Sequence, residues 1–211
     1  THALEAALHT YSRVDDAIGW SYEDEGHVTV VFTFPTADAT WRYDAQTHIW
    51  TEWLSWDSGT STYGAHLACS HAYAFGKHLV GSCVDGKVYQ LSSTTYTDAG
   101  ATIRRLRRAP HIHNEHKRVF HHRLELDMRT GVGLASGQGE DPQMFMRFSN
   151  DGGNTWSSEQ WASLGPLQGY QRRVFWTRLG QARNRVYEVV TSDPVFVGIM
   201  NAYLIVSAGR H

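Results

Sequence analysis

The chain has 211 residues, a formal net charge of −2 and 41% hydrophobic residues, a composition typical of folded domains and not of disordered or polyanion-binding proteins. No apolar run approaches the ~20 residues of a membrane-spanning helix, and no signal peptide opens the chain, so we expect no membrane insertion. The only cysteines, Cys69 and Cys83, lie in apolar, strand-like segments. Buried free thiols in a reducing compartment are therefore favoured over a disulfide.

The chain begins with its one convincing helical stretch, residues 2–12, in which Leu4, Ala7, Leu8 and Tyr11 share a face. Beyond it, short apolar runs alternate with Gly, Asp, Ser and Thr, and aromatic residues make up 12% of the chain. This pattern is typical of antiparallel sheets. The predicted fold class is therefore all-β.

Residues 28–34, 40–43 and 49–53 are predicted to form a meander of three strands. Residues 78–80 and 88–92 are faintly similar to parts of the first two of these strands, and both lie the same number of residues further along the chain. Repeats of about 40 to 50 residues with several strands are typical of β-propeller blades. Residues 1–99 are therefore predicted to be a partial β-propeller of about two blades, preceded by the short helix. Either the other blades lie upstream of Thr1, in a longer protein, or the repeat is coincidental.

The composition changes near Gly100, because residues 101–123 hold seven Lys or Arg and a single acid, Glu115. Residues 100–211 are predicted to form a second domain, a β-sandwich-like platform. Its first strand is predicted at 119–128. The residues Phe120, Leu124, Leu126 and Met128 are placed on one face of that strand and Arg123, Glu125 and Asp127 on the other. Further strands are predicted at 143–149, 160–164, 171–179, 185–192 and 195–207.

One eight-residue stretch, 149–156, fits the pattern S-x-D-x-G-x-T-W, known as the Asp-box. In such a turn the Asp carboxylate accepts backbone N–H groups, Gly supplies a positive φ, and Trp covers the turn. The pattern occurs in sialidase-like and other β-propellers and in some β-sandwiches, so it predicts a structural hairpin and no catalytic group. The matching residues are Ser149, Asp151, Gly153, Thr155 and Trp156.

Arg104, Arg105, Arg107 and Arg108 form the candidate interface of the second domain. Such a segment could contact DNA phosphates, or it could pair with carboxylates of a neighbouring subunit in planar forks. We favour the subunit contact. The chain offers acidic counterparts at Asp15, Asp16, Glu23, Asp24 and Glu25.

The remaining patterns predict no catalytic residue, no cofactor and no metal site. A histidine cluster lacks further ligands and lies among cationic residues, so surface or inter-subunit histidines are favoured over metal ligation. The glycine-rich stretch 131–139 predicts a loop. No hydrolase or nucleotide motif occurs, so no enzyme is predicted. The clustered histidines are His111, His113, His116, His121 and His122.

Several stretches, taken in order, resemble the packaged-DNA stabilisation proteins of short-tailed bacteriophages, which form the tail hub or nozzle. They span nearly the whole chain. Besides the Asp-box, they are residues 11–17, 25–27, 33–36, 41–44, 107–111, 130–134, 139–143 and 192–195.

The resemblance implies the C-terminal portion of a longer virion protein, a homo-oligomeric ring of six-fold symmetry that is assembled in the bacterial host cytoplasm. Such a ring docks below the portal and adaptor proteins, retains the packaged double-stranded DNA without sequence-specific binding, and carries the tail needle and the tail spikes or fibres. The family has no catalytic residues. Two alternatives remain, a monomeric β protein and a glycan-binding or sialidase-like Asp-box propeller, whose sugars would stack on Trp50, Trp53 and Trp56.

Overall fold

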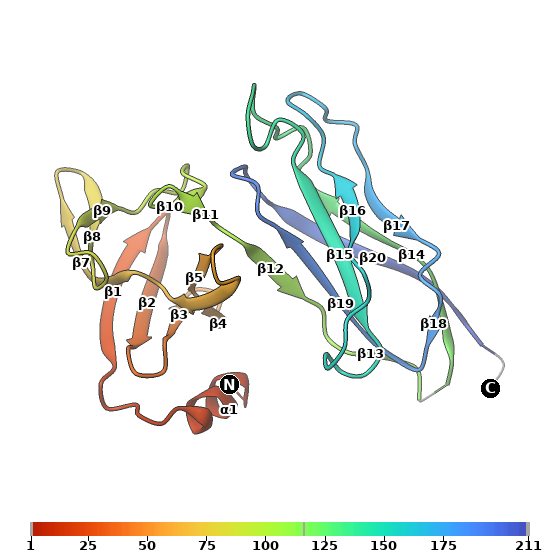
Figure 1. Cartoon of the computed structure of the whole chain (residues 1–211), viewed down its shortest axis with the longest axis horizontal. Coiled ribbons are helices and arrows are strands. Elements are labelled where there is room, and N and C mark those ends of the chain that lie inside the picture. Colours follow the sequence, from red (N-terminus) through yellow and green to blue (C-terminus); the bar gives the residue numbers. More distant parts are fainter. Residues whose placement is uncertain (1, 116, 210–211) are drawn as a thin grey trace. The chain divides into compact units, whose positions relative to one another are not determined.

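The computed structural model describes residues 2–115 and 117–209 (Figure 1). The chain divides into two compact units, Thr1–Ala101 and Thr102–His211. Helix α1, His2–Thr10, is followed by strands, and the strand pairings are antiparallel. The predicted all-β class is therefore confirmed. In the described part of the chain, no helix has both the length and the apolar character that a bilayer span requires.

The first sheet of unit 1 is a four-stranded meander in the order β1-β2-β3-β4. The three predicted strands are confirmed as β2, β3 and β4, and the structure adds β1, which the sequence reasoning missed. Strand β1 is exposed at five of its seven residues, so it lacks the apolar run that marks β2. The bounds are β1 Ile18–Asp24, β2 His27–Phe34, β3 Ala39–Asp44 and β4 Ile49–Glu52.

The rest of unit 1 holds a hairpin, β5-β6, a three-stranded sheet, β7-β8-β9, and a short pair, β10-β11, at the unit boundary. The sheet β7-β8-β9 repeats the antiparallel order of β1-β2-β3. The described residues contain no closed ring of such sheets, so propeller blades stay a prediction. The bounds are β5 Leu54–Asp57, β6 Thr62–Ala65, β7 Ala68–Ala74, β8 Lys77–Ser82, β9 Val88–Gln90, β10 Thr97–Asp98 and β11 Ala101–Thr102.

A disulfide joins Cys69 to Cys83, with an S–S distance of 2.03 Å, so the expectation of free thiols was wrong. Strands β7 and β8 are antiparallel, and Ala68 pairs with Ser82 at the end where the two cysteines lie. The backbone N–H of Cys83 also donates to Leu67 O at 2.9 Å, which extends the pairing past Ser82. Spacing in the sequence did not reveal this proximity because it depends on the register of the hairpin.

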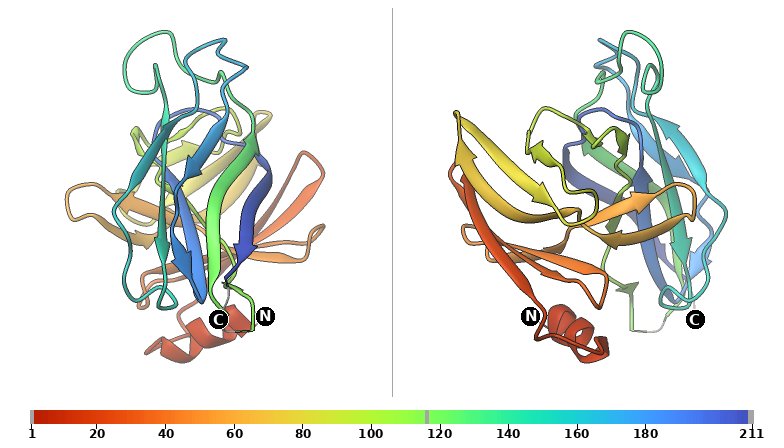
Figure 2. Two further views of the ribbon diagram at one scale, coloured as in Figure 1. Left: turned by 90° about the vertical axis from the view of Figure 1, so that its right-hand side faces the viewer. Right: turned by 60° about the vertical axis from the view of Figure 1, so that its left-hand side comes forward.

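Unit 2 is a β-sandwich, and Figure 2 shows its two layers edge-on, with β14 and β20 in one layer and β15 and β19 in the other. The first sheet runs β12-β19-β15-β16, and β13 also pairs with β19. In the second sheet β17 and β18 share one edge of β14, and β20 takes its other edge. The bounds are β12 Arg105–Arg108, β13 Ile112–His113, β14 Val119–Met128, β15 Gln143–Ser149, β16 Gln160–Ser163, β17 Val174–Thr177, β18 Gln181–Ala182, β19 Asn184–Thr191 and β20 Ile199–Ala208.

The hydrophobic core of unit 2 lies between these two sheets. Full burial of each large apolar side chain contributes about 1.5–3 kcal/mol, so this cluster holds the two layers together. The cluster comprises Leu124, Leu126, Met128, Met144, Met146, Leu164, Val174, Trp176, Leu179, Tyr187 and Val189.

Most predicted strands of unit 2 are confirmed, and β14 and β15 begin and end where the sequence placed them. Strand β20 was predicted from residue 195 but begins at Ile199, because its partner β14 ends at Met128, which pairs with Ile199. Strand β17 is likewise shorter than the predicted 171–179. The length of a strand thus depends on the length of its partner strand as well as on its own residues. Residues 131–139 form the predicted loop between β14 and β15.

One predicted face of β14 is wrong at its start. Phe120 was placed on the inner face, but it is 41% exposed, and His121 is 2% exposed instead. The β14-β20 register shifts between His121 and Arg123, which marks a β-bulge. An extra residue inverts the alternation of side chains on one side of a bulge, so Val119 and His121 face inward together with Leu124.

Candidate interaction surface

The basic segment predicted as an interface lies at an edge of the first sheet of unit 2. Strand β12 holds three of its four arginines and pairs with β19 on one side. Among the described residues no strand pairs with its other side. Arg107 is exposed, and the side chain of Arg108 is 53% exposed. The segment therefore presents positive charge and a row of backbone groups at one edge.

Two arginines of this segment also make contacts inside unit 2. The guanidinium of Arg104 lies 5.9 Å from the centre of the Phe145 ring. Arg105 donates from Nη1 to the backbone oxygen of Asp193 at 3.0 Å. These contacts orient the segment on the sheet, and the exposed Arg107 lies between Leu106 and Arg108 on β12.

Arg108 is held by a buried carboxylate that the sequence reasoning missed. Glu188 of β19 is 0% exposed and lies between two arginines on the neighbouring strands. Arg108 donates to Oε2 from Nε at 3.0 Å and from Nη2 at 2.7 Å. Arg147 of β15 donates to Oε1 from Nε at 2.6 Å, with its Nη2 at 2.5 Å. Each carboxylate oxygen thus accepts from one guanidinium, which compensates the cost of burying the charge.

The register of the sheet explains why these three residues meet. Both Arg108 and Arg147 are the direct cross-strand partners of Glu188. Directly paired side chains have Cβ atoms about 5 Å apart on the same face, which is the reach of an Arg–carboxylate pair. The sequence signal was a carboxylate inside the stretch 186–190 of β19, whose other residues are apolar, since a residue of that kind is fully buried only when it is paired.

The indole of Trp156 covers this ion pair. The guanidinium carbons of Arg147 and Arg108 lie 4.8 Å and 5.0 Å from the centre of the Trp156 ring. Both distances lie within the range of cation–π attraction. Trp156 therefore contributes to holding the two arginines in place around Glu188.

A hydrogen-bonded loop between β15 and β16 positions Trp156. Asp151 Oδ1 accepts from the Ser149 hydroxyl at 2.6 Å and from the Thr155 N–H at 2.9 Å. Its Oδ2 accepts from the Thr155 hydroxyl at 2.6 Å, and the Gly153 N–H donates to Ser149 Oγ at 2.8 Å. The hydroxyl of Ser149, followed by the groups of Thr155, lowers the pKa of Asp151 well below its usual range. Gly153 has a φ of 103°, which favours glycine.

A second buried charge, in this case a cation, lies near the loop. Arg185 of β19 is 1% exposed and donates to the backbone oxygens of Leu179 and Gln181 at 2.5 and 3.3 Å. Its Nε donates to Asn150 Oδ1 at 2.9 Å, and its guanidinium lies 4.1 Å from the centre of the Phe148 ring. Sequence reasoning had assigned Arg185 to a strand but not to a buried network. Its acceptors are mostly backbone oxygens, which leave no signal in the sequence.

The described histidines of the cluster do not converge on a common point. His121 is buried, and its Nδ1 lies 2.9 Å from the Tyr187 hydroxyl. Burial, followed by the charge of Arg185, lowers the pKa of His121 to about 4. His111 contacts Asn184, and His122 contacts Ser207, while His113 lies in β13. His116 lies outside the described residues. Within the described ranges, no group of three or more His, Cys, Asp or Glu side chains could hold a metal ion.

The tryptophans considered for sugar stacking do not form one exposed platform. Each is half-buried and packs on a different ring. This geometry favours a packing role. The ring pairs are Trp50 with Tyr43 at 4.8 Å, Trp53 with His66 at 4.0 Å and Trp56 with Tyr63 at 4.7 Å.

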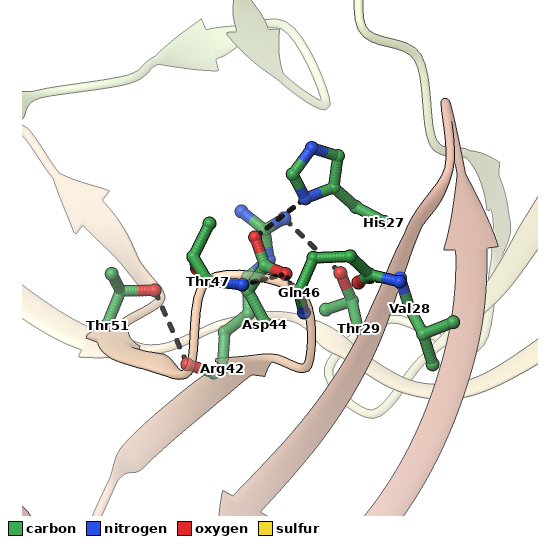
Figure 3. A network of polar contacts seen from close by, with 8 residues as sticks. All are labelled: His27, Val28, Thr29, Arg42, Asp44, Gln46, Thr47 and Thr51. Carbon is green, nitrogen blue, oxygen red and sulfur yellow. Dashed lines mark hydrogen bonds and ion pairs between the residues drawn. The ribbon is translucent and has the colours of Figure 1, made fainter.

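Figure 3 shows one polar network of unit 1, around the turn between β3 and β4. Asp44 accepts from the Gln46 N–H at 2.9 Å, and His27 Nδ1 lies 2.8 Å from its other oxygen. Gln46 in turn accepts from the Val28 N–H at 2.7 Å. Burial acts to raise the pKa of Asp44, but the hydrogen bonds from Gln46 and His27 outweigh it and lower that pKa. The network fixes the turn against β2.

Two of the five acidic residues predicted as counterparts of the basic segment have partners of their own in unit 1. Asp15 pairs with Arg13 at 2.7 Å, and Asp16 accepts from the Thr36 N–H at 2.9 Å. Glu23, Asp24 and Glu25 lie at the tip of the β1-β2 hairpin and are exposed.

A family model described as bacteriophage P22 Gp10, beta-sandwich, matches residues 84–207, more than half of the chain. The matched range includes β12 and all the residues around Glu188. The match confirms both the resemblance to phage tail hub proteins inferred from the sequence and the β-sandwich predicted for the second domain. No curated protein matches the chain with significant similarity.

Proposed function

This chain belongs to the bacteriophage P22 Gp10 β-sandwich family, and we propose that it joins the head-to-tail connector to the tail and helps to retain the packaged DNA. The family makes it a structural protein of the phage tail, in the virion. In this proposal it acts in a tail hub as a homo-oligomeric ring of six-fold symmetry that contacts the portal and adaptor proteins above, and the needle and the spikes or fibres below. It has no catalytic role, and it is assembled in the host cytoplasm.

The observation that supports an assembly role is the construction of the basic edge of unit 2. Glu188 and Trp156 hold Arg108 in place, while Arg107 remains exposed on the same strand. A rigid base that presents exposed arginine suits a contact with a neighbouring subunit or with the phosphates of nearby DNA. We propose that Arg104, Arg105, Arg107 and Arg108 form this contact, with Arg107 as the residue that reaches the partner.

The loop at 149–156 supports the same role as a structural Asp-box. Its polar side chains satisfy one another and the backbone, and its Trp lies on the arginines next to the proposed contact. In this proposal the loop stabilises the contact surface and binds no ligand. Unit 1 would supply blades to a propeller, in accordance with the repeated order of its two sheets.

The test is incorporation of the chain into a ring with purified portal and adaptor rings, followed by light scattering and negative-stain imaging. We expect a ring-shaped complex for the wild type and at least tenfold weaker incorporation for Arg107→Glu. Arg183→Glu is the matched control, because Arg183 is also an exposed arginine of unit 2 but lies outside β12. A wild-type chain that forms no ring under any of these conditions would contradict the proposed function. Equal incorporation of the two variants would refute the role of the basic segment.

A further inference from the structure

Strand β20 is an exposed edge whose one irregularity lies near its start, where the register with β14 skips Met200, so that the stretch 201–207 is free of bulges of its own. It pairs with β14 on one side, and no other strand pairs with it among the described residues. Nine of its ten residues are exposed, and Tyr203 and Ile205 are 55% and 54% exposed. The strand contains no charged residue and no proline. Natural edges are protected by charges, prolines, bulges or a covering segment, so the uncharged and mostly apolar stretch 201–207 is suited to pairing with another strand.

The order of side chains along β20 identifies that partner. Around Leu204 the strand is chemically symmetric, because residues at equal distances on either side are of the same kind. Tyr203 and Ile205 are large, and Ala202 and Val206 are aliphatic. The outermost members of the symmetric stretch, Asn201 and Ser207, are its two polar residues.

This symmetry suits an antiparallel pairing of β20 with β20 of a second copy, Leu204 opposite Leu204. In that register Tyr203 of each copy lies opposite Ile205 of the other, an aromatic and β-branched pair of the kind that stabilises sheets. Asn201 and Ser207 also lie opposite each other at both ends, where their side chains can hydrogen-bond. A shift by one residue would place polar side chains opposite apolar ones.

The size and charge of the contact suit a second copy as well. A ladder over 201–207 provides about seven backbone hydrogen bonds, within the 10 ± 5 of a typical protein interface. The strand is uncharged, so two copies meet without repulsion along it. On the neighbouring β14, Glu125 pairs with Arg123 at 2.8 Å and with Arg173, just before β17, at 2.7 Å, so this carboxylate has its partners within one copy.

We propose that two copies of this chain pair through β20, antiparallel and centred on Leu204, so that their second sheets become one continuous sheet. The contact has two-fold symmetry and closes on two copies, whereas a ring requires a head-to-tail contact between different surfaces. The dimer is therefore separate from the ring proposed above. It covers the apolar edge in chains that have not been assembled.

Sedimentation of the chain over a range of concentrations, without portal or adaptor proteins, tests this proposal. We expect a dimer for the wild type. Tyr203→Glu and Ile205→Lys should each raise the dissociation constant at least tenfold, because each places a charge opposite an apolar side chain. An equimolar mixture of the two variants should recover dimers, because the introduced carboxylate of one chain then lies opposite the introduced ammonium of the other. Trp161→Lys is the control, an exposed aromatic on the edge strand β16 of the other sheet that should leave the dimer unchanged.

Hydrogen exchange of the peptide 199–208 identifies the surface that is covered. Its amides should become protected as the concentration rises, and dilution should reverse the protection. A wild-type chain that stays monomeric at its highest soluble concentration would overturn the proposal. A dimer that persists in both β20 variants, or that leaves exchange in 199–208 independent of concentration, would overturn it too. None of these outcomes depends on whether the chain forms a ring on the adaptor.

Discussion

Replacing Glu188 by glutamine should destabilise unit 2 strongly, because this one carboxylate holds two arginines. Glu188→Gln preserves the shape of the side chain and removes its charge. The two guanidinium groups then face a neutral amide that offers one acceptor oxygen in place of two. The substitution therefore tests the electrostatic contribution of the site with little change in packing.

The magnitude follows from the exposure of the partners. Breaking a buried ion pair costs about 3–5 kcal/mol when the remaining charge stays buried. Here the side chains of Arg108 and Arg147 are 53% and 25% exposed, so both guanidiniums can recover water. We therefore expect a loss of about 3 kcal/mol, at the lower end of that range. Arg147→Gln should cost about 2 kcal/mol and Arg108→Gln about 1 kcal/mol, in the order of their burial.

The assay is hydrogen exchange over residues 184–191 in a series of urea concentrations, because this strand reports on unit 2 alone. The free energy of opening is compared among the wild type and the three variants at pH 7. A loss below about 1 kcal/mol for Glu188→Gln would refute the reasoning, since that is the contribution of an exposed pair. Equal losses for Arg108→Gln and Arg147→Gln would refute the role assigned to burial.

Three further predictions concern stability. Asp151→Ala removes the acceptor that orders the loop, so it should loosen the loop and shift the emission of Trp156. An unshifted emission would show that the loop does not need Asp151. The folded pKa of His121 is lowered to about 4, so between about pH 6.5 and 4 only the unfolded chain binds this proton, and stability falls as the pH falls. The loss of stability is at most about 3 kcal/mol, and it should be absent in His121→Gln. Urea midpoints that depend equally on pH in the wild type and in His121→Gln would contradict this prediction. Reducing the disulfide between Cys69 and Cys83, which are 14 residues apart, should destabilise residues 1–101 by about 3 kcal/mol and leave residues 184–191 unchanged in hydrogen exchange.

Local patterns predicted the strands of unit 2 well. Both ends of β14 and of β15 were predicted correctly, although β14 alternates apolar and polar residues only from Arg123 onwards and β15 is apolar throughout 144–146. The β-sandwich could also be predicted. Successive strands in which apolar and polar side chains alternate need a second layer to bury their apolar faces. Strand β1 was missed because it is mostly exposed and so carries a weak alternation.

What could not be predicted depends on register. Arg108 and Arg147 are far apart in the sequence and meet at Glu188 only because β12 and β15 flank β19 in one alignment. The bond between Cys69 and Cys83 depends in the same way on the β7-β8 hairpin. The sequence indicated which residues of the predicted interface are cationic. It did not indicate that one of them, Arg108, is held by a buried carboxylate.

The bulge in β14 determines which sequence changes the sandwich can accept. Substitutions along this strand alter one side chain each, whereas loss or gain of a single residue between His121 and Arg123 would exchange the inner and outer faces at one end of the strand. Relatives of this chain should therefore vary in residue type along 119–128 while keeping its length. Insertions would be tolerated at 135–138, the exposed part of the loop between β14 and β15, whose buried ends pack against residues 164–168.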